Sequence, residues 1–186
     1  MKNLSLSLLS LLFILSCAEN DPYSTRVLNA DTENESWLLH GRTYDESRFS
    51  PLNDINDSNV QDLGLGWSFE TGTNRGHETT PIVVDGVMFI TAPWSVVFAL
   101  DAKTGKEIWS FDPEADKDWA RNACCDVVNR GVAVWGDQVV FATIDGRLIS
   151  LDKASGLVNW DVLTIDKSKP YTITGAPRII DGKIII

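Results

Sequence analysis

Basic residues are scarce in this chain, and their scarcity excludes a large class of partners. The 186 residues include 16 Lys and Arg against 26 Asp and Glu, which gives a formal charge of -10 at pH 7. Contact with nucleic-acid phosphates depends on Lys and Arg, so we expect no nucleic-acid partner. Hydrophobic residues make up 44% and charged residues 23% of the sequence, a composition typical of a globular chain.

Long apolar runs and several common catalytic motifs are also missing. After Cys17, no apolar run approaches the roughly 18 residues that a helix needs to cross a membrane. The sequence contains no Cys-x-x-Cys-His haem motif, no glycine-rich phosphate loop and no Ser-His-Asp pattern that can be defended. The only histidines, His40 and His77, are far apart in sequence and make a weak case for a metal or haem site.

The first residues have the pattern of an export signal. Lys2 gives a basic start, and residues 4–16 form a Leu-rich apolar stretch that is too short to span a membrane permanently. The stretch ends in Ile14-Leu15-Ser16-Cys17, which resembles the bacterial lipoprotein processing box. We therefore expect a signal peptide over residues 1–16, lipid modification of Cys17 and a polar tether over residues 17–35. Simple cleavage after Ala18 is the alternative. Either route predicts export to the periplasmic side, and on the lipoprotein route a lipid at Cys17 would be the only membrane attachment.

The other two cysteines, Cys124 and Cys125, are neighbours in sequence. If Cys17 carries a lipid, they form an even pair, as expected in an oxidising compartment. Their Cα atoms lie about 3.8 Å apart across a trans peptide, which is closer than in most disulfides. The residues alone therefore leave two interpretations open, a pair of buried free thiols or a strained disulfide.

Short strands separated by tight turns dominate the remaining sequence, and no helical period is visible. The turn pairs are Asp85-Gly86, Gly136-Asp137, Asp145-Gly146 and Asp181-Gly182. The predicted strands cover residues 66–70, 80–84, 87–91, 96–100, 107–111, 132–135, 138–143, 147–151, 158–162 and 183–186.

Residues 99–109 and 150–160 repeat one pattern, Leu-Asp, a Thr/Ser-Gly turn and a Trp. A period of about 50 residues with four strands per unit is typical of a β-propeller blade. Trp67 fits the last-strand tryptophan of an earlier blade, where it would pack flat between neighbouring blades. One blade cannot bury its faces alone. Since the sequence stops within an apolar strand at Ile186, we expect the first two to three blades of a longer chain.

Motifs outside the repeat resemble those of the eight-bladed quinoprotein alcohol dehydrogenases, all-β propellers that use pyrroloquinoline quinone (PQQ). The similar segments are Trp37 with residues 40–55, then residues 76–86 (Gly-His-Glu-Thr-Thr-Pro), 122–131 (Asn-Ala-Cys-Cys-Asp-Val-Val-Asn-Arg-Gly) and 172–177 (Thr-Ile-Thr-Gly-Ala-Pro). The resemblance implies that residues 36–186 form the N-terminal part of such a propeller, about its first third.

The resemblance also implies a set of cofactor-binding residues, Glu78, Cys124, Cys125, Arg130 and Thr174. A Cys124–Cys125 disulfide would stack on one face of PQQ, Arg130 would contact its quinone oxygens, and Glu78 and Thr174 would hydrogen-bond it. Because PQQ carries three carboxylates, we expect a cation near Glu78, or a protonated Glu78. Without the resemblance, Arg130 would be a surface ion-pair partner, and Glu78 and Thr174 ordinary strand residues.

Other parts implied by the resemblance have no candidates in this sequence. Calcium, or a lanthanide, would bridge cofactor and protein, but its ligands and the catalytic base correspond to positions after Ile186. A haem c in a later domain is left open. Trp94 and Trp119 could line a pocket, although core or docking roles are simpler. We assign no metal ligand and no catalytic base, and we expect the fragment alone to be inactive.

Two main hypotheses follow, and a third is weaker. The first is the N-terminal portion of an exported PQQ-dependent dehydrogenase that oxidises an alcohol to an aldehyde or ketone and passes electrons to a cytochrome c or a quinone. The second is a non-enzymatic lipoprotein propeller built from the same repeats, acting as an outer-membrane assembly scaffold. The third is a propeller of this fold that binds no cofactor. The lipoprotein box suits the scaffold, whereas the Glu78, Cys124-Cys125 and Arg130 set suits the enzyme.

Overall fold

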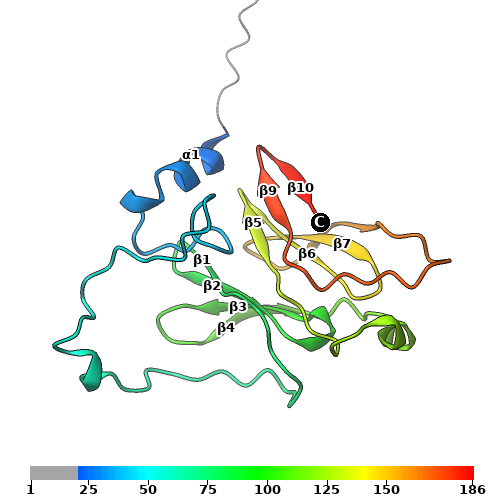
Figure 1. Cartoon of the computed structure of the whole chain (residues 1–186), viewed down its shortest axis with the longest axis horizontal. Coiled ribbons are helices and arrows are strands. Elements are labelled where there is room, and N and C mark those ends of the chain that lie inside the picture. The colour runs from blue at the N-terminus through cyan, green and yellow to red at the C-terminus, as the bar shows by residue number, and fades with distance from the viewer. Residues whose placement is uncertain (1–20) are drawn as a thin grey trace, which may run out of the picture.

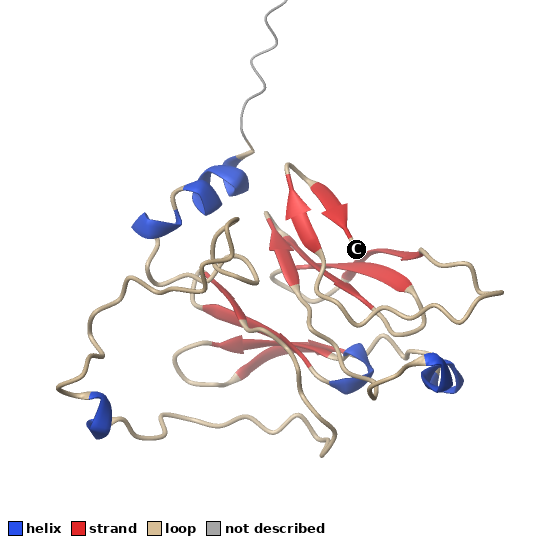
Figure 2. Ribbon diagram, viewed as in Figure 1, coloured by secondary structure: helices blue, strands red, loops and turns tan. Residues whose placement is uncertain are grey.

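Antiparallel sheets make up most of the regular secondary structure of the computed structural model, which describes residues 21–186 (Figures 1 and 2). The first sheet has the order β1 (Ile82–Val84), β2 (Val87–Thr91), β3 (Val97–Asp101) and β4 (Glu107–Phe111). The second has the order β5 (Ala133–Trp135), β6 (Gln138–Ala142), β7 (Arg147–Asp152) and β8 (Val158–Leu163). A hairpin of β9 (Arg178–Ile180) and β10 (Lys183–Ile185) begins a third sheet.

The helical elements are short. In the described part of the chain they are α1 (Pro22–Leu28) and four 3-10 turns, η1 (Ala30–Thr32), η2 (Val60–Asp62), η3 (Pro93–Ser95) and η4 (Lys117–Asn122). Within residues 21–186 no helix has the length and apolar character required to cross a bilayer.

The two four-stranded sheets are the predicted propeller blades. Each is a meander of neighbouring antiparallel strands, and each has a register shift at the same place in its third strand, between Ala99 and Leu100 and between Ser150 and Leu151. The first strands, β1, β5 and β9, lie toward a common centre, whereas β4 and β8 lie outside (Figure 1). The core between the sheets is apolar and includes Phe89 and Phe141, both fully buried.

The predicted tight turns are present and follow from their sequences. Asp85 and Gly86 join β1 to β2 with φ values of 53° and 79°, and Asp181 and Gly182 join β9 to β10 with 48° and 68°. A two-residue hairpin with both residues in the left-handed region favours Asp-Gly, because glycine has no Cβ and Asp tolerates this backbone.

The repeated Leu-Asp, Thr/Ser-Gly and Trp pattern builds one docking contact twice. The Trp109 indole donates to the carbonyl of Lys153 at 3.0 Å, and the Trp67 indole donates to that of Ala102 at 3.2 Å. Each ring lies over the turn glycine of the next blade. In each turn an Asp accepts hydrogen bonds from the backbone N–H and the hydroxyl of the residue three positions later, Asp101 from Thr104 and Asp152 from Ser155. The bonds from Thr104 hold the pKa of Asp101 below its ordinary value.

Two strand predictions differ from the structure. Residues 66–70 are not a strand, because none of the described residues pairs with their backbone in a ladder, although Trp67 and Phe69 pack against the cluster that contains Phe98. Trp67 nevertheless docks as predicted. Strand β9 was missed, because the turn-forming Gly175-Ala176-Pro177 sequence directly before it hides a three-residue strand.

The segment predicted as a polar tether contains a folded helix. Asp21 caps α1 by accepting from the N–H groups of Tyr23 and Ser24, and Pro22 occupies the first turn, where it needs no donor. Tyr23 and Val27 are buried in the main core, and the Tyr23 ring lies 5.1 Å from that of Trp135. The tether prediction is therefore wrong for residues 21–35, because two apolar side chains outweigh a polar composition. Residues 1–16 and Cys17 lie outside the described residues.

Helix α1 lies across the hairpin turns at one end of the sheets. Arg26 forms ion pairs with Glu33 and with Asp85 of the β1–β2 turn, at 2.6 and 2.8 Å. Ser24 donates to Asp181 of the β9–β10 turn at 3.3 Å. These contacts tie the helix to two different sheets at the ends of their innermost strands.

Gly156→Ala should destabilise the protein more than Gly86→Ala. Both glycines have left-handed backbones, with φ of 72° and 79°, which costs any other residue about 1–2 kcal/mol. A Cβ at Gly156 would meet the Trp109 ring at 2.8 Å, whereas Gly86 has open space around it. Displacing the indole should add about 1–3 kcal/mol. Thermal unfolding of the full-length variants measures the difference, and equal losses would refute the docking contact.

Tyr23→Phe should reduce the loss of stability at alkaline pH. Burial raises the pKa of the Tyr23 phenol well above its ordinary value of 10.0. The unfolded chain therefore releases this proton near pH 10 while the folded chain keeps it, so the contribution to stability is complete below pH 10 and falls as the pH rises. Thermal midpoints measured from pH 8 to 11 should converge between wild type and variant. Parallel curves would show that Tyr23 is solvated.

Candidate functional site

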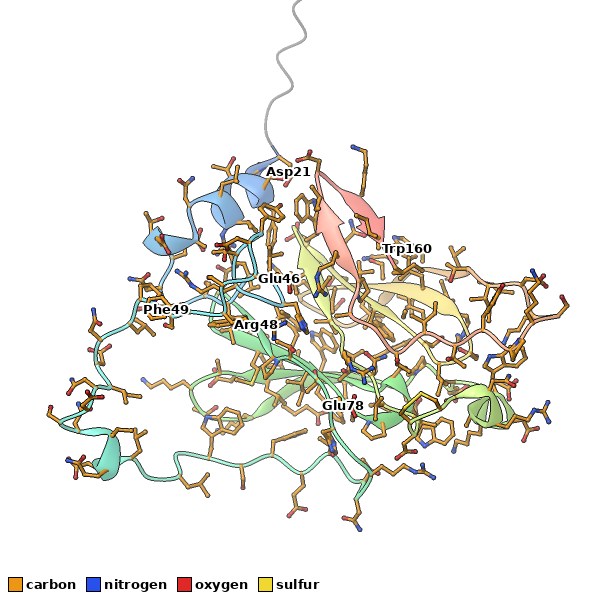
Figure 3. The ribbon with its side chains drawn as sticks, viewed as in Figure 1. Asp21, Glu46, Arg48, Phe49, Glu78 and Trp160 are labelled. Carbon is orange, nitrogen blue, oxygen red and sulfur yellow. A yellow bond between two sulfur atoms is a disulfide. The ribbon has the colours of Figure 1, made fainter. Side chains whose placement is uncertain are left out.

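Three segments that lead into the innermost strands bring the predicted site residues together. Glu78 lies on the segment before β1 (Figure 3), Cys124, Cys125 and Arg130 lie between η4 and β5, and Thr174 precedes β9. These segments enter their strands at the end opposite the hairpin turns that α1 covers. Residues almost a hundred positions apart in sequence thus meet because each begins a blade.

Cys124 and Cys125 are joined by a disulfide, with Cα atoms 3.8 Å apart. Both residues are exposed, so the interpretation of buried free thiols is wrong. Together they line a hollow of about 140 Å³ whose walls are Ala123, Cys124, Cys125, Asp126, Val128, Arg130, Thr172 and Thr174. Pockets for small molecules usually have at least about 300 Å³. The described residues therefore offer one wall of a site.

Arg130 links the three segments. Its guanidinium donates to the Thr174 hydroxyl at 3.0 Å and forms an ion pair with Glu78. Its backbone N–H donates to the Thr174 carbonyl, also at 3.0 Å. The predicted cation near Glu78 is thus Arg130. Both charged side chains are 40% exposed, so the ion pair contributes little to stability by itself.

The arrangement suits a flat anionic ligand with polar edges. The disulfide supplies a polarisable surface, and beside it stand a forked guanidinium and a hydroxyl. A guanidinium can bind carboxylate or carbonyl oxygen through two donors at once. Because the side chains of Arg130 and Glu78 remain partly exposed, each can also bind a ligand that enters from solvent.

An ion pair that the sequence did not reveal secures the disulfide segment. Asp126 follows Cys125 with a left-handed φ of 71° and pairs with Arg75, which comes from the segment that carries Glu78. The Arg75 guanidinium also lies 5.7 Å from the centre of the Trp94 ring. Arg75 lies three residues before Glu78 and directly before the similar segment 76–86, and this proximity is the only sign of the pair in the sequence.

The two tryptophans considered as pocket residues have other partners. Trp94 is half-buried: it packs against the small apolar cluster of Ala115, Val127 and Ile144, and it also lines a hollow of about 440 Å³ that is separate from the one beside the disulfide. The Trp119 indole, on η4, donates to the Tyr171 carbonyl at 2.8 Å, and Lys167 lies 4.0 Å above its ring. Trp119 thereby ties the segment before the disulfide to the segment before Thr174.

The histidines do not form a metal centre with the residues around them. His77 contacts the Thr71 hydroxyl at 2.7 Å, and burial together with Arg178 and Arg48 lowers the pKa of His40. Over residues 21–186, no three His, Cys, Asp or Glu side chains group in a way that could hold a metal ion.

A protein-family model described as "PQQ: Glucose/ethanol/alcohol dehydrogenase, beta-propeller domain" matches residues 37–186. The chain is 52% identical to quinohemoprotein alcohol dehydrogenase ADH-IIG of Pseudomonas putida over 87% of its own length and 23% of that protein. It is 53% identical to the 1-butanol dehydrogenase (cytochrome c) of Thauera butanivorans, over 81% of this chain and 22% of that protein.

Solved structures agree with the sequence matches. The structure of ADH-IIG from Pseudomonas putida superposes with a TM-score of 0.84 at 52% identity, covering 86% of this chain and 24% of that one. A europium-containing methanol dehydrogenase gives a TM-score of 0.79 at 37% identity, with 84% and 28% covered. The chain thus spans about a quarter of its relatives, less than the third expected.

Trp119→Phe should loosen the segment before Thr174 without unfolding the blades. The variant keeps the ring under Lys167 but removes the N–H that binds the Tyr171 carbonyl. Hydrogen–deuterium exchange of the full-length protein should become faster in residues 164–177. Trp67→Phe removes an equivalent indole bond elsewhere and should leave that segment unchanged. Unaltered exchange in Trp119→Phe would show that the contact does not hold the two segments together.

Proposed function

The chain belongs to the PQQ family of glucose/ethanol/alcohol dehydrogenase β-propeller domains, and we propose that it is the N-terminal portion of an exported PQQ-dependent alcohol dehydrogenase. One observation carries the proposal. The Cys124–Cys125 disulfide, Arg130 and Thr174 line one hollow, and Glu78 joins them through its ion pair with Arg130.

The chemistry of these residues fits PQQ, a flat ortho-quinone with three carboxylates. The two sulfur atoms would support one face of the ring system. Arg130 would direct its forked donors at the quinone or carboxylate oxygens, and the Thr174 hydroxyl, which accepts from Arg130, would still have its own O–H to donate to the ligand. Glu78 could then hydrogen-bond a protonated edge of the cofactor, or balance the charge of Arg130 before the cofactor enters.

When bound, PQQ would supply the oxidant for converting an alcohol to an aldehyde or ketone, with two electrons and two protons passing to the quinone and the electrons then leaving to a cytochrome c or a quinone. The residues of this chain would bind PQQ and polarise its quinone oxygens. Arg130 would stabilise negative charge that develops on the quinone oxygens, because a fixed guanidinium needs no reorganisation as the charge appears. The disulfide would keep water from the ring face that it covers.

The remaining parts of the enzyme are proposals from the relatives. The acceptor would be a cytochrome c, as the name of the Thauera butanivorans protein states for that enzyme. A haem c domain would follow, as the name quinohemoprotein indicates for ADH-IIG. A calcium ion or a lanthanide would complete the site, and a europium-containing relative supports the second option. Its ligands would come from residues outside this sequence.

Export is proposed from the sequence alone. Residues 1–16 would be removed as a signal peptide, and Cys17 would be lipidated, which places the propeller on the periplasmic side of the envelope. Three residues separate Cys17 from Asp21, the cap of α1. The folded domain would therefore sit close to its anchor, without a long tether.

The scaffold hypothesis is not favoured. A non-enzymatic propeller needs the Trp and glycine docking pairs, but it gains nothing from a solvent-exposed disulfide beside an arginine. The closely related proteins named above are dehydrogenases. A propeller that has lost its cofactor would not need the Glu78, Arg130 and Thr174 contacts either.

Arg130→Ala should weaken PQQ binding by the full-length protein by at least about tenfold, since a lost charge-assisted hydrogen bond costs about 1.5–3 kcal/mol. The double variant Cys124→Ala/Cys125→Ala should also weaken binding by at least about tenfold, because it removes the sulfur surface that would support the ring. Titration with PQQ measures the affinity, and reconstitution with calcium or a lanthanide measures alcohol-dependent dye reduction. Arg26→Ala removes an ion-paired arginine at the opposite end and should alter neither. Full PQQ affinity in both site variants would refute the proposed site, and no alcohol oxidation by the reconstituted wild type would refute the proposed activity.

A further inference from the structure

Asn129, directly before Arg130, is completely engaged in the interior. Its exposure is 2%. Its amide nitrogen donates to the Ser95 hydroxyl at 2.9 Å and to the Ala142 carbonyl at 2.7 Å, and its amide oxygen accepts from the Gly131 N–H at 2.7 Å. Both donors and the acceptor of the side chain therefore have partners, which fixes the amide in one orientation.

Those partners belong to different blades. Ser95 lies on η3 between β2 and β3 of the first sheet, and Ala142 ends β6 of the second. The hydrogen bond from the Gly131 N–H to the Asn129 side chain joins the two residues that flank Arg130, so it constrains the backbone of Arg130. Asn129 thus sets the path of the Arg130 backbone with respect to two sheets at once.

A second buried side chain holds the same stretch of backbone. The Thr91 hydroxyl, fully buried at the end of β2, lies 3.0 Å from the Asn129 carbonyl and 3.2 Å from that of Gly131. Thr79, next to Glu78, also donates to the Gly131 carbonyl, at 2.8 Å. The segment that carries Glu78 and the backbone around Arg130 are therefore fastened to each other beneath the hollow.

We propose that Asn129 is a positioning residue for PQQ binding, with Thr91 as its support: it does not line the hollow, but it holds Arg130 at the angle from which the guanidinium reaches both Thr174 and the ligand. The proposal rests on the proposed function. The positioning role goes beyond that function, because Asn129 is not among the residues predicted to touch the cofactor and does not line the hollow.

A purely structural role for Asn129 is the competing explanation, and a double-mutant cycle separates the two. Residues that act through one another give non-additive effects, whereas independent residues give additive ones. Arg130→Lys keeps the charge but loses the forked donors, so it retains measurable binding while removing the geometry that Asn129 would serve.

The experiment measures PQQ affinity and amide exchange in the full-length protein. Asn129→Ala should weaken PQQ binding about tenfold in the wild-type background and less than about twofold in the Arg130→Lys background. Thr91→Val, which keeps the side-chain shape, should show the same pattern with a smaller loss. Thr143→Val removes a fully buried hydroxyl that bonds within the β6–β7 hairpin, so it should lower the thermal midpoint and leave the affinity unchanged.

The exchange measurement does not depend on the cofactor. The Arg130 N–H donates to the Thr174 carbonyl, so its exchange should become faster in Asn129→Ala and Thr91→Val and stay unchanged in Thr143→Val. Equal losses of affinity in both backgrounds, or unchanged exchange at Arg130, would overturn the positioning role. If the wild type binds no PQQ at all, the proposed function fails, while the exchange result still decides whether Asn129 positions Arg130.

Discussion

Tryptophan rings packed on the turn glycines of the next blade set the spacing on which the site depends. Trp67 lies over Gly105, and Trp109 lies over Gly156. Because each indole also donates to the carbonyl of the residue three positions before that glycine, in the same turn, the contact fixes both distance and direction. The Trp109–Gly156 contact joins the first blade to the second, and Arg130 of the second blade can reach Glu78 of the first only while this spacing is kept.

The two ends of the sheets have different tasks. At one end, hairpin turns with left-handed Asp-Gly pairs are covered by α1, whose Arg26 and Ser24 contact the turns of two sheets. At the other, the segments that enter β1, β5 and β9 are long, irregular and rich in charge. This second end carries exposed groups, such as the disulfide and the Arg130–Glu78 pair, and an ion pair this exposed stabilises the fold little by itself.

Much of this could be predicted from the sequence. Tight-turn pairs and strand alternation located β2 and β4 to the residue, because both signals are local. The repeat with its tryptophans indicated the blades, and the resemblance supplied the five site residues. Helix α1 was missed because its apolar face consists of two residues in a polar segment. Strand 66–70 was over-predicted because pairing depends on a neighbour that no local pattern reveals. The Arg75–Asp126 pair and the contacts of Asn129 join residues far apart in sequence, so only the folded arrangement reveals them.

The most direct measurement is a crystal structure of the full-length protein grown with PQQ. The account predicts the ring system in contact with both sulfur atoms of Cys124 and Cys125, with the Arg130 guanidinium within about 3 Å of a quinone or carboxylate oxygen. Ring density remote from this disulfide, or Arg130 directed away from the cofactor, would contradict the account.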